Sequence, residues 1–173
     1  MKQWTIADTE QKREAAVRFL CRHAEDLGVP YKWSTILTSI YTAINDNGLL
    51  FALDRLGCVR GILAYTISKR SGTEDQTRIE VHLLFLEAGF RAWNSLTEAM
   101  SALAAELAER FRANSEIGFY CTPTEKHHSL FSKFASVNNT RLHPCGMLSY
   151  YVTSLEQLKY YVARYTSRSL KKQ

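Results

Sequence analysis

Glu80 and His82 are the residues of this sequence best suited to move a proton. They lie two positions apart in a segment that alternates apolar and polar residues, and residues i and i+2 of a strand project from the same face. A carboxylate beside an imidazole can act as a general base toward a substrate. A second interpretation stays open, because Leu84 and Leu86 continue the same face and would equally suit a packed or partner-covered surface.

The other reactive side chains do not form a recognisable motif. His127 and His128 are adjacent, but neighbouring residues of a helix point about 100° apart. No Asp, Glu or Cys joins them at metal-ligand spacing, so no metal is expected. The cysteines form no CxxC pair, and we expect four reduced, buried thiols. These are Cys21, Cys58, Cys121 and Cys145.

The positive charge of the chain is concentrated at its end. There are 22 Lys and Arg against 17 Asp and Glu, a formal charge of +5 in 173 residues. Four of these charges, with no acid, lie in the last ten residues, so the rest of the chain is close to neutral. Tyrosines before this segment could stack on RNA while the basic residues neutralise phosphates. A solvated helix end explains the same residues.

Length and composition fit one compact domain. With 46% hydrophobic residues the chain can bury a single core, and we predict one domain over residues 1–165 with a basic tail at 166–173. No apolar run approaches the ~20 residues of a membrane-spanning helix. The first residues carry no apolar stretch of signal-peptide type, so a cytoplasmic protein without a membrane partner is expected.

Hydrophobic periodicity predicts mixed strands and helices. Alternation indicates strands at 3–7, 49–53, 59–67, 79–85, 117–121, 141–143 and 147–153. Helical spacing indicates helices at 8–26, 34–44, 95–114, 125–135 and from 154 onward. Asp8 is the expected cap of the first helix, and Ser95 with Glu98 matches a capping box at the start of the clearest one.

This order, with three consecutive strands before the clearest helix, resembles the GNAT (GCN5-related N-acetyltransferase) fold. Residues 50–63 look like the second and third strands of that family, and 81–86 like the fourth. Residues 89–96 (GFRAWNSL) lie where the family has its phosphate-binding turn, R/Q-x-x-G-x-G/A, and 130–134 (LFSKF) where it reads L-Y-x-K-x-G-F. The likeness covers about residues 1–153. It implies an α/β (α+β) fold with a central mixed, mostly antiparallel sheet, helices on both faces and an extra C-terminal helix.

The resemblance implies an N-acyltransferase that moves an acetyl group from acetyl-CoA to a primary amine of a small molecule or peptide. In the family, acetyl-CoA lies between the fourth and fifth strands, and its pyrophosphate is held by the turn and by the start of the long helix, where unpaired N–H groups attract anions. Carried over to this sequence, the catalytic residues are Glu80 and His82. The implied cofactor-binding residues are Phe85, Leu86, Arg91, Trp93, Asn94 and Ser95.

Three residues depart from the family pattern. Asn94 and Leu96 stand where glycines usually let the backbone approach phosphate. Phe131 has no hydroxyl and stands where the family often has a tyrosine that protonates the CoA thiolate. A non-catalytic GNAT-like binding or oligomerisation module, which could form a homodimer, is therefore the alternative hypothesis. An RNA-directed acetyltransferase is the third, although a nucleic-acid partner is otherwise not expected.

Overall fold

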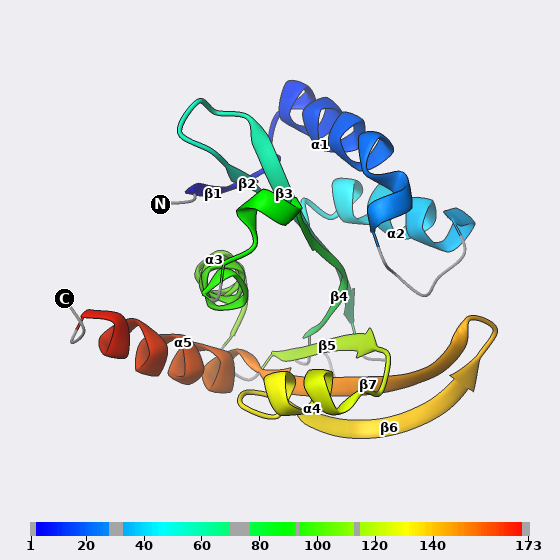
Figure 1. The fold of residues 1–173 in the computed structure, drawn as a ribbon, viewed down its shortest axis with the longest axis vertical. Coiled ribbons are helices and arrows are strands. Elements are labelled where there is room, and N and C mark those ends of the chain that lie inside the picture. The colour runs from blue at the N-terminus through cyan, green and yellow to red at the C-terminus, as the bar shows by residue number, and fades with distance from the viewer. Residues whose placement is uncertain (1–2, 28–32, 70–76, 93, 113–114, 171–173) are drawn as a thin grey trace. The chain divides into compact units, whose positions relative to one another are not determined.

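The computed structural model describes residues 3–27, 33–69, 77–92, 94–112 and 115–170 (Figure 1). In these residues the strands are β1 (Gln3–Ile6), β2 (Leu49–Leu53), β3 (Val59–Lys69), β4 (Thr77–Leu86), β5 (Glu116–Cys121), β6 (Ser136–His143) and β7 (Gly146–Ser154). The helices are α1 (Glu10–Arg22), α2 (Trp33–Asn45), α3 (Ser95–Arg110), α4 (Glu125–Phe131) and α5 (Leu155–Leu170), with short 3-10 helices η1 (Ala24–Asp26) and η2 (Ala88–Phe90). The strands form one sheet in the order β1-β2-β3-β4-β5-β7-β6, which confirms the predicted α/β fold class.

The chain divides into two compact units. The first comprises Met1–Ile67 and Val81–Ser95, and the second comprises Ser68–Glu80 and Leu96–Gln173. Strand β4 therefore contributes its first four residues to the second unit and its remainder to the first. Among the described residues, no helix is both long enough and apolar enough to cross a membrane.

The core of the first unit lies between its two main helices and one face of its strands. Strands β1, β2 and β3 pair antiparallel in sequence order. Alternate residues of β2, β3 and β4 belong to one buried cluster with apolar residues of α1 and α2. Its members include Ala16, Phe19, Leu20, Ile36, Ile40, Leu49, Phe51, Ile62, Ala64, Leu83 and Phe85. This cluster fixes which residues of β4 face the helices.

The cap of α1 differs from the prediction. Thr9 is the N-cap residue, and its hydroxyl oxygen accepts a hydrogen bond from the Lys12 amide at 3.3 Å. Asp8 lies one residue earlier and accepts a hydrogen bond from the Lys12 side chain at 2.6 Å. Asp and Thr can both cap a helix, so residue type alone could not decide between Asp8 and Thr9.

The second unit has an antiparallel sheet whose outermost strand was predicted too short. Strand β7 pairs with both β5 and β6. Strand β6 begins at Ser136, five residues before the predicted start, and α4 ends at Phe131, four residues before the predicted end. Since β6 lies at the edge of the sheet and most of its residues are exposed, it carries no apolar alternation that would reveal a strand.

All four cysteines are free, as expected, but the expectation that they are buried is wrong. Cys21 and Cys58 are exposed, and Cys121 and Cys145 are partly exposed. Cys21 lies on α1 outside the buried positions of that helix, and Cys58 lies in the turn between β2 and β3. The apolar character of the thiol did not decide its position here.

Asp54 organises the turn between β2 and β3. Its Oδ1 accepts hydrogen bonds from the amides of Leu56 (2.8 Å) and Cys58 (2.9 Å), and its Oδ2 accepts one from Arg60 Nε (2.9 Å). The hydrogen bond from the Cys58 amide is the largest cause that holds the pKa of the Asp54 carboxyl below its usual value of 3.8, and Arg60 lowers it further. The ionised carboxylate therefore stabilises the folded chain.

This lowered pKa predicts acid sensitivity. Stability from Asp54 is present above the unfolded-state pKa and is lost as the pH falls through the folded-state pKa. In urea unfolding between about pH 5 and pH 3, Asp54→Asn should lose less stability on acidification than the parent protein does. Glu109→Gln, which removes an exposed carboxylate of α3, is the control and should follow the parent curve. Identical pH slopes for Asp54→Asn and the parent protein would refute this assignment.

Candidate functional site

The two predicted catalytic residues both lie on β4, in different polar surroundings. The Glu80 side chain is 29% exposed, and its carboxylate lies 4.0 Å from the Arg78 guanidinium. His82 is half-buried, and its Nε2 lies 2.8 Å from the Thr66 hydroxyl oxygen on β3. The partly exposed carboxylate of Glu80 is accessible to a substrate, whereas Nε2 of His82 already has a hydrogen-bond partner.

The contact between His82 and Thr66 does not fit regular alternation in both β3 and β4. His82 contacts Thr66, which by alternation shares a face of β3 with Ile62 and Ala64, and the next residue, Leu83, is buried in the same cluster as these two. Adjacent residues of a regular strand cannot reach one face, so one of these two strands departs from regular alternation between Ala64 and Thr66 or between His82 and Leu83.

The Leu86 side chain packs against Gly61 of β3. A Cβ on Gly61 would overlap the Leu86 side chain and would lie 2.9 Å from the Phe85 carbonyl oxygen. Leu86 therefore lies on the Gly61 face of β3, which is opposite to the face of Ile62. The sequence alone could not reveal this, because it does not show which residue of β3 faces Leu86.

Glu80 belongs to a polar cluster that sequence reasoning missed. Arg78 Nη2 and Nε donate to the Tyr150 hydroxyl at 2.6 and 3.1 Å, and Arg78 Nε lies 3.5 Å from Glu116 Oε1. The guanidinium also lies 5.0 Å from the centroid of the Tyr150 ring. Alternation could have placed Arg78 beside Glu80, but Glu116 and Tyr150 come from β5 and β7, whose pairing the sequence does not reveal.

Gly118 makes room for this cluster. A Cβ at this position of β5 would overlap the Tyr150 hydroxyl, so a side chain there would displace the phenol from Arg78. Burial is the main cause that raises the pKa of Tyr150, and the hydrogen bond from Arg78 opposes it. The phenol thus stays neutral near pH 7, and the two carboxylates with one guanidinium leave the cluster with a net negative charge.

Arg91 is the residue of the predicted phosphate turn that is best placed to bind an anion. It is exposed, its Nε donates to the Leu86 carbonyl oxygen at 2.7 Å, and its guanidinium lies 5.5 Å from the Phe85 ring centroid. Its terminal nitrogens, Nη1 and Nη2, have no partner among the described residues. A guanidinium fixed through Nε and open at both amino groups suits bidentate contact with phosphate.

Ser95 stabilises the same turn through hydrogen bonds of its hydroxyl and its backbone amide. It is buried, and its hydroxyl accepts a hydrogen bond from the Ala92 amide at 2.7 Å and donates to the Phe90 carbonyl oxygen at 3.3 Å. Its own amide donates to the Ala92 carbonyl oxygen at 3.0 Å. These contacts favour a structural role for Ser95 over direct contact with a ligand.

The remaining predicted cofactor-binding residues differ in burial and in backbone conformation. The side chains of Phe85 and Leu86 are buried in packing. Asn94 is half-buried and has no positive φ, because Asn47 is the only non-glycine residue with one in the described part of the chain. Asn94 therefore does not imitate a glycine. Trp93 lies outside the described residues.

The described residues contain no group of three or more His, Cys, Asp or Glu that could hold a metal ion. His127 instead directs Nδ1 at the Thr122 carbonyl oxygen, 2.8 Å away. The absence of a metal cluster does not bear on whether a transferase activity is present.

Comparison with known proteins identifies the fold. No family sequence profile matches the chain, and no curated protein is significantly similar to it. Solved structures, by contrast, match over almost the whole chain, and these matches show that the chain has the fold of the GNAT acetyltransferases.

Three of these structures illustrate the range of the fold. Naa50 of Arabidopsis thaliana, in complex with the bisubstrate analogue CoA-Ac-MVNAL, has a TM-score of 0.66 at 14% identity, covering 87% of this chain and 98% of its own. The polyamine N-acetyltransferase of Drosophila melanogaster has a TM-score of 0.64 at 11% identity, covering 88% and 100%. FeeM, an N-acyl amino acid synthase from uncultured soil microbes, has a TM-score of 0.63 at 12% identity, covering 92% and 99%.

Proposed function

We propose that this chain is an N-acyltransferase that moves an acetyl group from acetyl-CoA to a primary amine. The observation that carries the proposal is Arg91, whose two terminal nitrogens are open to an anion in the turn between β4 and α3 of a GNAT fold. The turn precedes the N-terminus of α3, and the dipole of a helix attracts anions at that end. Arg91 is accordingly the proposed pyrophosphate ligand.

The reaction needs one base and a correctly placed amine. The amine nitrogen attacks the thioester carbonyl carbon, a C–N bond forms, the C–S bond breaks, and CoA leaves as a thiolate. Glu80 takes the proton that the amine loses, directly or through water, and this proton then restores the CoA thiol through solvent. His82 is the second candidate base and would act through water, because Thr66 already contacts its Nε2.

The acceptor is proposed to be an amine of a small molecule or peptide. The cluster of Glu80, Glu116 and Arg78 has two carboxylates for one guanidinium, and its net negative charge would attract an alkylammonium ion. Among structures of the same fold, one holds a bisubstrate analogue with a peptide part, one is a polyamine N-acetyltransferase and one is an N-acyl amino acid synthase. An amine group is common to these acceptors.

Acetyl-CoA should bind the wild-type protein and raise its melting temperature. At a concentration 100 times its Kd, the ligand stabilises the folded state by ~2.7 kcal/mol. Arg91→Ala should weaken CoA binding by about 10- to 100-fold, the usual cost of losing a charged hydrogen-bond partner. Calorimetry with CoA measures both values.

Arg55→Ala is the matched control, because Arg55 is also an exposed arginine of the first unit and lies in the turn between β2 and β3. It should leave CoA affinity unchanged. If saturating acetyl-CoA does not shift the melting temperature of the wild-type protein, the transferase proposal is wrong, and the non-catalytic module becomes the better hypothesis.

A further inference from the structure

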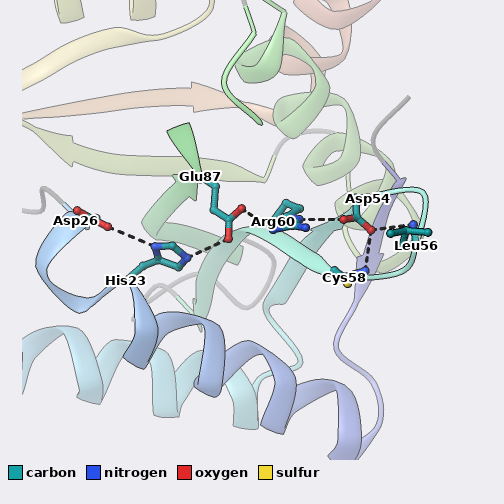
Figure 2. Close-up of polar contacts among 7 residues, drawn as sticks. All are labelled: His23, Asp26, Asp54, Leu56, Cys58, Arg60 and Glu87. Carbon is teal, nitrogen blue, oxygen red and sulfur yellow. Dashed lines mark hydrogen bonds and ion pairs between the residues drawn. The ribbon is translucent and has the colours of Figure 1, made fainter. Parts of the chain in front are cut away.

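The segment that carries Arg91 is anchored at its start by Glu87, the first residue after β4. Figure 2 shows its two carboxylate oxygens directed at two different partners. Oε1 lies 3.0 Å from His23 Nε2 at the end of α1, and Oε2 accepts a hydrogen bond of 3.0 Å from Arg60 Nη1 on β3. The Glu87 amide also donates to the Arg60 carbonyl oxygen at 2.9 Å. Both the side chain and the backbone of Glu87 are therefore fixed.

The contacts continue on both sides of Glu87 (Figure 2). On one side, Arg60 Nε donates to Asp54, whose carboxylate is held by the amides of Leu56 and Cys58. On the other side, His23 Nδ1 lies 3.4 Å from Asp26 Oδ2. We give the name Glu87 network to Glu87, His23, Arg60, Asp54 and Asp26. Both ring nitrogens of His23 face carboxylates, and a protonated imidazole would donate to both of them.

Partial burial lets the pair of His23 and Glu87 contribute more to stability than a surface ion pair does. The His23 side chain is 17% exposed and that of Glu87 is 19% exposed. Exposed ion pairs contribute little because water screens them, whereas partly buried pairs are screened less. The pair of His23 and Glu87 is therefore able to help hold the backbone at Glu87 in place.

Glu87 also determines the conformation of the residues that follow it. It is the N-cap residue of η2, and its carbonyl oxygen accepts a hydrogen bond from the Phe90 amide at 2.8 Å. The Arg60 guanidinium lies 5.9 Å from the Phe90 ring centroid, and the Phe90 carbonyl oxygen accepts a hydrogen bond from the Ser95 hydroxyl. Since η2 is only one turn long, its own hydrogen bonds cannot hold it, and Arg91 follows directly after it.

We infer that Glu87 is a positioning residue for phosphate binding. Through His23 and Arg60 it holds residues 88–92 in the conformation that presents the two open nitrogens of Arg91 to the CoA phosphates. The inference rests on the proposed function for the identity of the ligand, but the holding of the turn does not depend on any ligand. Loosening the turn lowers the population that can bind, and the apparent affinity falls by the same factor.

The test is Glu87→Gln, which keeps the shape of the side chain and removes its charge. We expect Kd for CoA and KM for acetyl-CoA to rise about tenfold, with kcat at saturation unchanged. The kcat/KM for S-acetylpantetheine, which has no phosphate, should stay within twofold. Glu25→Gln removes an exposed carboxylate of η1 outside the network and should change none of these values.

A double-mutant cycle decides whether Glu87 acts through Arg91. The variant with both Glu87→Gln and Arg91→Ala should bind CoA no more weakly than Arg91→Ala alone, because the turn then has no guanidinium left to present. Additive losses, an unchanged Kd in Glu87→Gln, or an equal loss with S-acetylpantetheine would overturn the inference.

Amide hydrogen exchange of the free protein separates this inference from the proposed function. In Glu87→Gln, the amides of residues 88–92 should exchange faster, while those of β5 keep the parent rate. Unchanged exchange at residues 88–92 overturns the positioning role even where CoA binds. Failure of the wild-type protein to bind CoA instead overturns the proposed function, whatever the exchange result.

Discussion

Replacing Glu80 by Gln should lower kcat for acetyl transfer by about 10²- to 10³-fold, the usual contribution of a general base. Glutamine keeps the size of the side chain but cannot take a proton from the attacking amine. The side chain is half-exposed and lies beside Arg78, so the substitution adds no buried unpaired group to the core. Steady-state kinetics with acetyl-CoA and a panel of primary amines measure kcat, and calorimetry should show that Kd for CoA stays within twofold.

Glu116→Gln provides the matched control for this experiment. Glu116 also places a carboxylate beside Arg78, at 3.5 Å against 4.0 Å for Glu80, so both substitutions remove one negative charge from the same guanidinium. Only Glu80 is proposed to accept the proton, and Glu116→Gln should cost less than about tenfold in kcat. Equal losses in both variants would show that charge near Arg78, and not proton transfer, is what matters.

His82→Gln distinguishes the two candidate bases. Because Nε2 of His82 contacts Thr66, we expect a smaller loss from His82→Gln than from Glu80→Gln. If His82→Gln lowers kcat a hundredfold and Glu80→Gln does not, the base is the imidazole, and the assignment to Glu80 is wrong.

The elements that bury an apolar face were predictable from the sequence. Strands β2, β3 and β4 and helix α3 have strong apolar periodicity, and they were placed within a few residues of their ends. Strand β6 was largely missed for the opposite reason, since most of its residues are exposed and polar. Periodicity reports burial, so an edge strand with little burial produces almost no signal.

The candidate site was predictable only in part, because its contacts join distant segments. Glu80 and Arg91 could be singled out from local spacing and from the family resemblance. The partners of Arg78 on β5 and β7 depend on strand pairing, and the Glu87 network joins α1, β3 and the end of β4. The contact between His82 and Thr66 likewise depends on how β3 and β4 pair, which no local pattern shows.

The fold of the first unit and the Glu87 network depend on the same aromatic residue, Phe19. Its side chain is 2% exposed, and its ring lies 4.6 Å from the His23 ring and 5.9 Å from the Phe85 ring, centroid to centroid. Phe19→Ala should therefore lower the free energy of unfolding by about 3–5 kcal/mol, through lost burial and the cavity left behind. Urea unfolding at pH 7 measures this change.

Two substitutions on the same helix show whether packing is the cause. Phe19→Leu keeps most of the volume and should cost less than about 1.5 kcal/mol. Val17→Ala removes an apolar side chain that is 39% exposed and should cost under about 1 kcal/mol. Because Phe19 supports the His23 ring, Phe19→Ala should also speed amide exchange at residues 88–92, which Val17→Ala should leave unchanged. A stability loss in Phe19→Ala as small as that in Val17→Ala would mean that α1 does not pack on β4 as described, and the anchoring of Glu87 by His23 would fail with it.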